Sequence, residues 1–274
     1  MSLLQVQKFR GKMGDTMADK NYLHTAYSWS ADGIDGFTTV YPNLNLIEGT
    51  KDFSGDWINS GAWQNDGTYK GLTVKKRTAQ WNGINKTFTA PKDGVYTFSA
   101  YIKASGTTTT IIRHRIVNGV AQTDHLIGSN FDWRIDTVTV SLKTGQTGFF
   151  RYEISTNNAD AILWTAGHKW ESGSTATPYM LSASEVTTAD WPKYVGTYVD
   201  TNPVSSTVSS KYDWDEMKYR VYLDGTPVGG SKLLSFDLEN LKAGTSYNVQ
   251  VSQINGNVES DKSESVAFKT TLPK

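Results

Sequence analysis

The sequence predicts an all-β protein built from two consecutive sandwiches. Its 274 residues are long enough for about two domains. Along most of the chain, short runs of alternating polar and apolar residues are separated by Gly, Asn, Asp and Pro, and helical periodicity is weak. Such runs follow one another closely over residues 43–185 and predict a jelly roll there, while those of residues 202–274 predict a second, smaller sandwich.

The composition excludes several kinds of site. Lys plus Arg and Asp plus Glu each number 27, so the chain lacks the basic excess of a nucleic-acid-binding protein. Because it has no cysteine, it has no disulfide, no catalytic thiolate and no zinc–thiolate centre. The first residues lack the pattern of a secretory signal, and no apolar run is long enough to span a membrane. We therefore expect synthesis in a cytoplasm and no membrane insertion.

Residues 1–42 are polar and mixed, and turn signals interrupt them. Residues 27–30 read as a short strand that ends in a turn at Asp32 and Gly33. We expect this segment to be a tether and docking piece and not a domain.

The clearest strand of the jelly roll covers residues 95–103. Its even-numbered residues are apolar and should face the core, whereas its odd-numbered residues, Tyr101 among them, should line the open face of the sheet. A later strand, residues 149–154, alternates in the same way and puts Arg151 and Glu153 on an open face.

The strand over residues 111–117 carries two arginines on one side and a histidine on the other. Alternation predicts that Arg113 and Arg115 lie on the open face. His114 alternates with two isoleucines, so we expect it to be buried and hydrogen-bonded.

The last part of the chain follows an expected linker, residues 186–201. Asp224 and Gly225 end a strand in a hairpin turn, and Tyr247 begins a strand directly after another turn. This second feature is the tyrosine-corner pattern of immunoglobulin-like sandwiches. Residues 202–274 therefore resemble a compact fibronectin type III domain, a kind of module used as a spacer or partner-binding unit, and we assign no chemistry to them.

Four separate sequence segments show a further resemblance, and they cover residues 27–33, 41–46, 49–55 and 166–179. They resemble segments of antireceptor, tail-tip and accessory baseplate proteins of siphophages that infect lactococci and streptococci. The module that contains them is similar to the jelly-roll carbohydrate-binding modules attached to xylanases and related hydrolases. The size of the chain and its fibronectin-like end favour an accessory baseplate protein.

This resemblance implies a virion protein of the phage tail baseplate, made in the host cytoplasm and acting at the bacterial surface. Its expected partners are host cell-wall polysaccharide and other baseplate or tail proteins, without nucleic acid. The implied function is saccharide binding during adsorption, without catalysis. Two alternatives stay open: a purely structural baseplate spacer, and a cell-wall polysaccharide depolymerase.

Carbohydrate modules stack aromatic rings on the C–H faces of sugars and use polar side chains for the hydroxyls. On this basis the candidate saccharide-binding residues are Trp57, Trp63, Trp81, Tyr101, Arg113, Arg115, Trp133, Arg151 and Glu153. The first three tryptophans lie in Gly-, Asn- and Ser-rich surroundings, and the alternative is that each plugs one end of the sandwich. Trp133 fits either the ligand surface or the core, whereas Trp164 and Trp170 lie in strand-like runs and are predicted to be core.

The arginines would suit a phosphorylated or acidic polysaccharide, because a guanidinium group pairs two oxygens at once. The alternative is ordinary Arg–Glu pairing across the strands of a solvated sheet.

We expect no cofactor, with a structural calcium ion as the open question. Related jelly rolls often hold such an ion where the first and last strands meet, and the resemblance implies Glu48, Asp52 and Glu171 near that seam. The sequence has no dense Asp run of the kind found in calcium loops. Nucleophile elbows, phosphate loops and the His-Glu-x-x-His motif are also absent from it.

Overall fold

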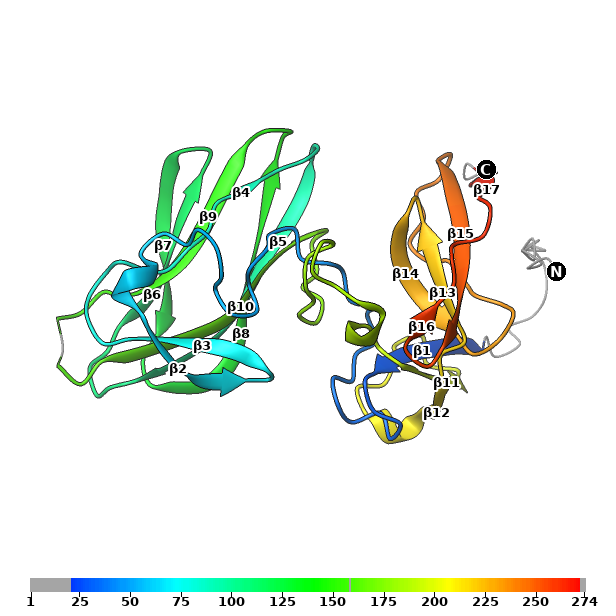
Figure 1. The fold of residues 1–274 in the computed structure, drawn as a ribbon, viewed down its shortest axis with the longest axis horizontal. Helices are drawn as coiled ribbons and strands as arrows, with labels where there is room; N and C mark the ends of the chain where they lie inside the picture. Colours follow the sequence, from blue (N-terminus) through cyan, green and yellow to red (C-terminus); the bar gives the residue numbers. More distant parts are fainter. Residues whose placement is uncertain (1–20, 158, 272–274) are drawn as a thin grey trace. The chain divides into compact units, whose positions relative to one another are not determined.

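The computed structural model describes residues 21–157 and 159–271, which form two compact all-β units (Figure 1). One unit is Leu44–Val186, and the other combines the described residues up to Asn43 with those from Thr187 onward. The described residues contain no helix that is long and apolar enough to cross a membrane. Residues 1–20 of the expected tether lie outside the described part of the chain.

The jelly-roll unit consists of two antiparallel sheets, one in the order β2-β3-β10-β5-β8 and the other in the order β4-β9-β6-β7. Its elements are η1 (Ser60–Ala62), β2 (Gln64–Tyr69), β3 (Leu72–Arg77), β4 (Phe88–Thr89), β5 (Gly94–Ser105), β6 (Ile111–Val117), β7 (Val120–Gly128), β8 (Phe131–Leu142), β9 (Thr147–Ile154) and β10 (Ile162–Ser172). This arrangement confirms the predicted all-β jelly roll.

The core of this unit lies between the two sheets and is rich in aromatic rings. Trp170 is completely buried, and its ring stacks on Phe88 at a centroid distance of 4.7 Å. Phe98 of one sheet and Phe150 of the other meet edge to face at 5.4 Å. The inward half of the alternation predicted for β5 is confirmed, because Tyr96, Phe98 and the later even-numbered residues belong to this core. The open face was predicted wrongly for Thr97 and Ser99, which are 1% and 3% exposed. The prediction that Trp170 is core is also confirmed.

The prediction for β6 was wrong about which side faces inward. Arg113 pairs directly with Tyr152 of β9, and residues directly opposite each other in an antiparallel sheet share a face. Tyr152 lies in the core, so Arg113 and Arg115 point into the sandwich and His114 points away from it. His114 is half-buried and contacts Asp124 through its Nδ1 at 2.7 Å.

The second unit contains a three-stranded sheet in the order β1-β11-β12 and a sheet in the order β14-β13-β15-β16, in which β17 also pairs with β15. Its elements are β1 (Tyr22–Ser28), η2 (Thr188–Asp190), β11 (Tyr194–Asp200), η3 (Ser209–Lys211), β12 (Asp213–Glu216), β13 (Tyr219–Leu223), β14 (Thr226–Ser231), β15 (Ser246–Asn255), β16 (Val258–Glu259) and β17 (Val266–Lys269).

The expected tether and linker need correction, because both contribute a strand to this second unit. All seven residues of β1 pair with β11, which lies inside the expected linker. The reason is burial: Tyr27 and Val195 pair across these strands and are 5% and 1% exposed. Tyr41 and Trp191, also from these segments, stack at 5.6 Å and contribute to the same core.

Two predicted turns of the second unit are confirmed. Asp224 and Gly225 both have positive φ, 48° and 80°, as a tight hairpin of this type requires. The Tyr247 hydroxyl accepts a hydrogen bond from the Lys242 backbone N–H at 2.9 Å, which is the contact that defines a tyrosine corner. Residues 202–271 therefore carry the predicted immunoglobulin-like features, and the second unit adds β1 and β11 to the sandwich that the sequence predicted.

Candidate functional site

Two of the three loop tryptophans are buried and present no ring to a ligand. Trp57 is 6% exposed, and its indole N–H donates to the Ser54 carbonyl at 3.1 Å. Trp63 is 5% exposed and donates to the Asn82 carbonyl at 2.8 Å. Both rings belong to the core cluster, so the structure agrees with the alternative that they plug the sandwich. Trp81, in contrast, is 47% exposed.

The arginines of β6 do not form a polar floor, since both point into the sandwich. Arg113 is 5% exposed and forms an ion pair with Asp136 of β8, in the opposite sheet. The Tyr152 hydroxyl donates to the same carboxylate at 2.8 Å. Burial, and then the Asp136 carboxylate, raise the pKa of Tyr152 well above its usual value. Arg115 is half-buried and donates to the Thr123 carbonyl of β7 at 2.9 Å. Both arginines therefore connect strands of the sandwich, Arg113 between the two sheets and Arg115 within one sheet.

Arg151 and Glu153 lie on the outer face of β9 and form the ordinary ion pair that was the alternative for them. Their Nε and Oε1 atoms are 2.8 Å apart. Glu153 is 3% exposed, and the same carboxylate oxygen accepts the Gly83 backbone N–H at 3.1 Å. The pair therefore holds the loop that follows β3, on a different sheet from Tyr101.

The outer face of the five-stranded sheet carries a group of rings, which we name the outer aromatic cluster. Its half-buried members are Tyr69, Tyr101, Trp133, Trp164 and Tyr179, packed on Leu72, Val74 and Ala166. Trp133 stacks on Tyr69 at 4.3 Å with an interplanar angle of 12°, and Tyr101 meets Tyr69 edge to face at 5.3 Å. Burial, and then Tyr69, raise the pKa of Tyr101. The cluster thus unites two of the predicted site residues, Tyr101 and Trp133.

Three of its aromatic members were missed by the sequence analysis. The prediction that Trp164 is core was wrong, because Leu163 fills the core and the next residue of β10 must point outward. That alternation was the signal that could have located Trp164. Tyr69 ends β2 beside a turn, and Tyr179 follows β10, so the local pattern gave no indication that either joins this surface.

Charged side chains surround the cluster. The Lys70 ammonium lies 5.9 Å from the Tyr69 ring centre and 5.7 Å from that of Tyr101. The Trp164 indole N–H donates to Asp66 at 2.6 Å, and Lys103 lies 5.7 Å from the Trp164 ring centre. Such ammonium groups are attracted to ring faces. Apolar rings, hydrogen-bond donors and acceptors therefore occur together on one surface.

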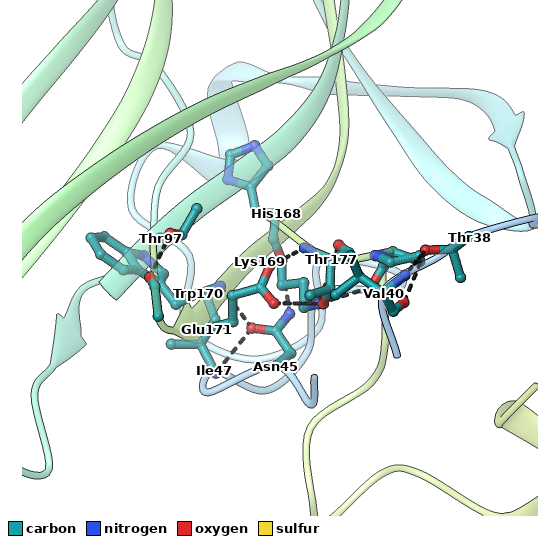
Figure 2. A network of polar contacts seen from close by, with 12 residues as sticks. Thr38, Val40, Asn45, Ile47, Thr97, His168, Lys169, Trp170, Glu171 and Thr177 are labelled. Carbon is teal, nitrogen blue, oxygen red and sulfur yellow. Dashed lines mark hydrogen bonds and ion pairs between the residues drawn. The ribbon is translucent and has the colours of Figure 1, made fainter. Parts of the chain in front are cut away.

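The expected calcium seam contains an internal cation instead (Figure 2). Lys169 is fully buried, and its ammonium contacts Glu171 at 3.2 Å, the Thr177 hydroxyl at 2.7 Å and the Pro178 carbonyl at 2.8 Å. Burial lowers the pKa of Lys169 to about 8, against the opposing effect of Glu171. Among the residues that the structure describes, no group of three or more His, Cys, Asp or Glu side chains could hold a metal ion. Glu48, Asp52 and Glu171 therefore do not assemble into a metal site.

The chain was compared with protein-family models, curated proteins and solved structures. A family model described as the minor structural protein 5-like, C-terminal domain (BppU-like) matches residues 192–250, within the second unit. A search of curated proteins finds no match. The xylan-binding domain CBM22-1 of Paenibacillus barcinonensis Xyn10C is 16% identical and covers 50% of this chain and 99% of its own, with a TM-score of 0.35. A putative sugar binding protein of Bacteroides thetaiotaomicron is 13% identical, with coverages of 47% and 100% and a TM-score of 0.33.

A chain in the structure of the tripod (BppUct-A-L) from the baseplate of bacteriophage Tuc2009 also matches. It is 49% identical and has a TM-score of 0.71, and the match covers 94% of this chain and 100% of that one. The resemblance to phage baseplate proteins is thereby confirmed, and the chain belongs to the family of this Tuc2009 baseplate tripod protein.

Proposed function

We propose that this chain is an accessory protein of a phage tail baseplate, and that its jelly-roll unit binds host cell-wall saccharide through the outer aromatic cluster during adsorption. Membership of the Tuc2009 family supports the place in the virion and other baseplate proteins as partners. The observation that carries the saccharide part is the cluster itself, in which rings from separate strands remain half-buried on a sheet face.

The chemistry of the cluster suits a sugar. A pyranose laid on the rings removes apolar C–H and ring surface from water, which is worth about 25 cal/mol per Å². Lys70, Asp66 and Lys103 stand at the rings and offer hydrogen bonds to hydroxyl groups. Stacking of Tyr69 on Trp133 fixes both rings before the ligand arrives, so little side-chain entropy is lost on binding. A weak site of this kind gains strength when a baseplate presents many copies.

The test is binding of purified host cell-wall polysaccharide to the full chain, measured by calorimetry. Tyr69→Ala and Trp133→Ala should each weaken binding about tenfold, the loss of one ring–sugar stack. The double variant should bind little worse than either single variant, because each change already breaks the same ring pair. Tyr219→Ala, which removes a half-buried tyrosine of β13 in the second unit, is the matched control and should bind as the native chain does.

A structural role is the competing account, and the partial burial of the cluster favours it. Under that account the Tyr69 and Trp133 variants are less stable to urea, and the native chain binds no polysaccharide from any susceptible host strain. Absence of binding by the native chain therefore refutes the proposed function. Binding that survives both changes refutes the cluster as its site.

A further inference from the structure

We propose that the loop after β3, residues 80–83, presents Trp81 as a second saccharide contact that is separate from the outer aromatic cluster. The inference rests on the proposed function for the class of ligand, but the site itself follows from independent observations. These are a strained backbone, a set of hydrogen bonds that holds the strain in place, and an indole that remains exposed.

The backbone of this loop is in a conformation that its residues rarely adopt. Trp81 and Asn82 have φ values of 55° and 54°, so two consecutive residues other than glycine lie in the left-handed region. For a bulky residue such as tryptophan this is a genuine outlier. Strain of this kind persists only where the surroundings enforce it, and it concentrates at functional sites.

Arg77, the last residue of β3, enforces the conformation from the inside. Its guanidinium donates to the Trp81 carbonyl at 2.6 Å, to the Ala62 carbonyl at 2.7 Å and to the Gln80 carbonyl at 2.8 Å. The side chain is 8% exposed, and burial lowers its pKa. One planar fork thus fixes three carbonyl groups in a geometry that a flexible ammonium group cannot reproduce.

Other contacts tie the loop to β9. The Trp81 backbone N–H donates to the Ile154 carbonyl at 3.1 Å, and the Gly83 N–H donates to Glu153 at 3.1 Å. A side chain at Gly83 would meet the Tyr152 carbonyl at 2.6 Å, so only glycine lets the loop lie this close to the strand. The Gly83 carbonyl in turn accepts from the Asn59 amide at 3.0 Å. The loop is therefore rigid before any ligand binds.

The indole of Trp81 contributes little to the fold. The side chain is 47% exposed, and within the described part of the chain its ring makes no aromatic contact and its N–H no hydrogen bond. The two other tryptophans of this region, Trp57 and Trp63, belong to the core. A large ring held outward by a strained, hydrogen-bonded backbone is already fixed in place, so it would lose little conformational freedom on contact with a ligand.

The surroundings favour a neutral saccharide. The charged side chains that bond to the loop, Arg77 and Glu153, are only 8% and 3% exposed, and residues 58–64 and 78–85 add amides, hydroxyls and glycines but no charge. Asn82 is exposed beside the ring, where its amide can both donate and accept. A hollow of about 320 Å³ lies on the segment Gly55–Ser60, which is bonded to the loop through Asn59. One exposed indole with a neighbouring amide matches a sugar ring with its hydroxyls.

The two surfaces belong to different sheets. Trp81 is bonded to β9 of the four-stranded sheet, whereas the outer aromatic cluster lies on the outer face of the five-stranded sheet. A ligand could therefore bind at the Trp81 loop without contacting the outer aromatic cluster, or at the cluster without contacting the loop. A unit with two contacts could engage one polysaccharide chain twice, or two chains at once, which increases avidity without any new fold.

The test uses the full chain labelled with 5-fluorotryptophan, so that the nine tryptophans report separately by fluorine NMR. Size-fractionated oligosaccharides from host cell-wall polysaccharide are the probe. We expect saturable shifts of Trp81 and of Trp133 and Trp164, while Trp214 of the second unit stays constant. In the Tyr69→Ala variant the Trp81 shift should persist with its midpoint unchanged within about twofold. In Trp81→Ala the shifts of the cluster tryptophans should persist likewise.

The outcomes separate the two proposals. If the cluster signals move and Trp81 does not, the second contact is refuted and the proposed function stands. If Trp81 moves only while the cluster is intact, there is one site, and the inference is again refuted. If Trp81 moves alone, the second contact holds and the cluster loses its role. If no signal moves, both proposals fail.

Discussion

Acidification from pH 7 to pH 5 should destabilise the jelly-roll unit through one residue, His168. The imidazole is 1% exposed, and the edges of Phe53, Trp57 and Phe98 surround it at centroid distances near 5.5 Å. Its Nε2 lies 2.9 Å from the Thr165 hydroxyl. Burial lowers the pKa of His168 from 6.5 to about 3, because the charged ring would lose its water in this setting.

The direction of the effect follows from proton binding. The folded pKa of His168 lies below the unfolded value, so above pH 6.5 neither state binds the proton and the full stability is present. Between pH 6.5 and about 3 only the unfolded chain binds it, and stability falls with each step of acidification. Each pH unit is worth about 1.4 kcal/mol, so the loss at pH 5 is about 2 kcal/mol. Asp52 and Glu185 also have lowered pKa values, but they reduce the stability only as the pH falls toward their ordinary values of 3.8 and 4.5, which lie below pH 5.

The assay is urea unfolding at pH 7 and pH 5, followed by the fluorine signal of 5-fluorotryptophan at Trp170 in the jelly-roll core. His168→Gln cannot ionise and should abolish most of the difference between the two pH values. His125→Gln, at an exposed position, is the matched control and should keep the native difference. Equal unfolding free energies at both pH values in the native chain, or an unchanged difference in His168→Gln, would show that the reasoning is wrong.

Three further predictions concern buried charge, a turn and the strained loop. Lys169→Met leaves Glu171 buried without its ammonium partner and should cost about 3 to 5 kcal/mol in urea unfolding, whereas Lys169→Met with Glu171→Leu should recover most of that loss. Tyr247→Phe removes the hydrogen bond to the Lys242 N–H and should cost about 1 kcal/mol in the second unit; an unchanged unfolding midpoint would contradict this. Trp81→Gly relieves a left-handed backbone and should stabilise the jelly-roll unit by about 1 kcal/mol, despite the loss of a large side chain. A less stable Trp81→Gly protein would mean that the indole contributes to the fold.

Features that depend on residues close together in the sequence could be predicted from it. The alternation of β5 follows from one face packing on the core, and Asp224-Gly225 and Tyr247 are local turn chemistry. The pairing of β1 with β11 was missed because it joins residues such as Tyr22 and Asp200, far apart along the chain.

The candidate site was predicted less well, because its errors concern partners from other strands. Arg113 can point inward only because Asp136 of the opposite sheet neutralises its charge. The sequence of β6 alone gives no indication of that partner. Trp57 and Trp63 occupy polar loops but fold back into the core, with each indole N–H satisfied by a carbonyl. Composition identifies a loop, but it does not say on which side of the loop the ring lies.

The union of β1 and β11 in one sheet has a consequence for how such proteins diversify. The jelly roll is inserted between two strands that are neighbours, and its own ends are joined by the bridge between Asn45 and Ser182. The two boundaries of the jelly-roll unit, at residues 43/44 and 186/187, therefore lie between the β1–β11 pairing on one side and the Asn45–Ser182 bridge on the other. Under the proposed function, recombination that replaces residues 44–186 would change the saccharide that is bound, while the second unit keeps all its own strand pairs.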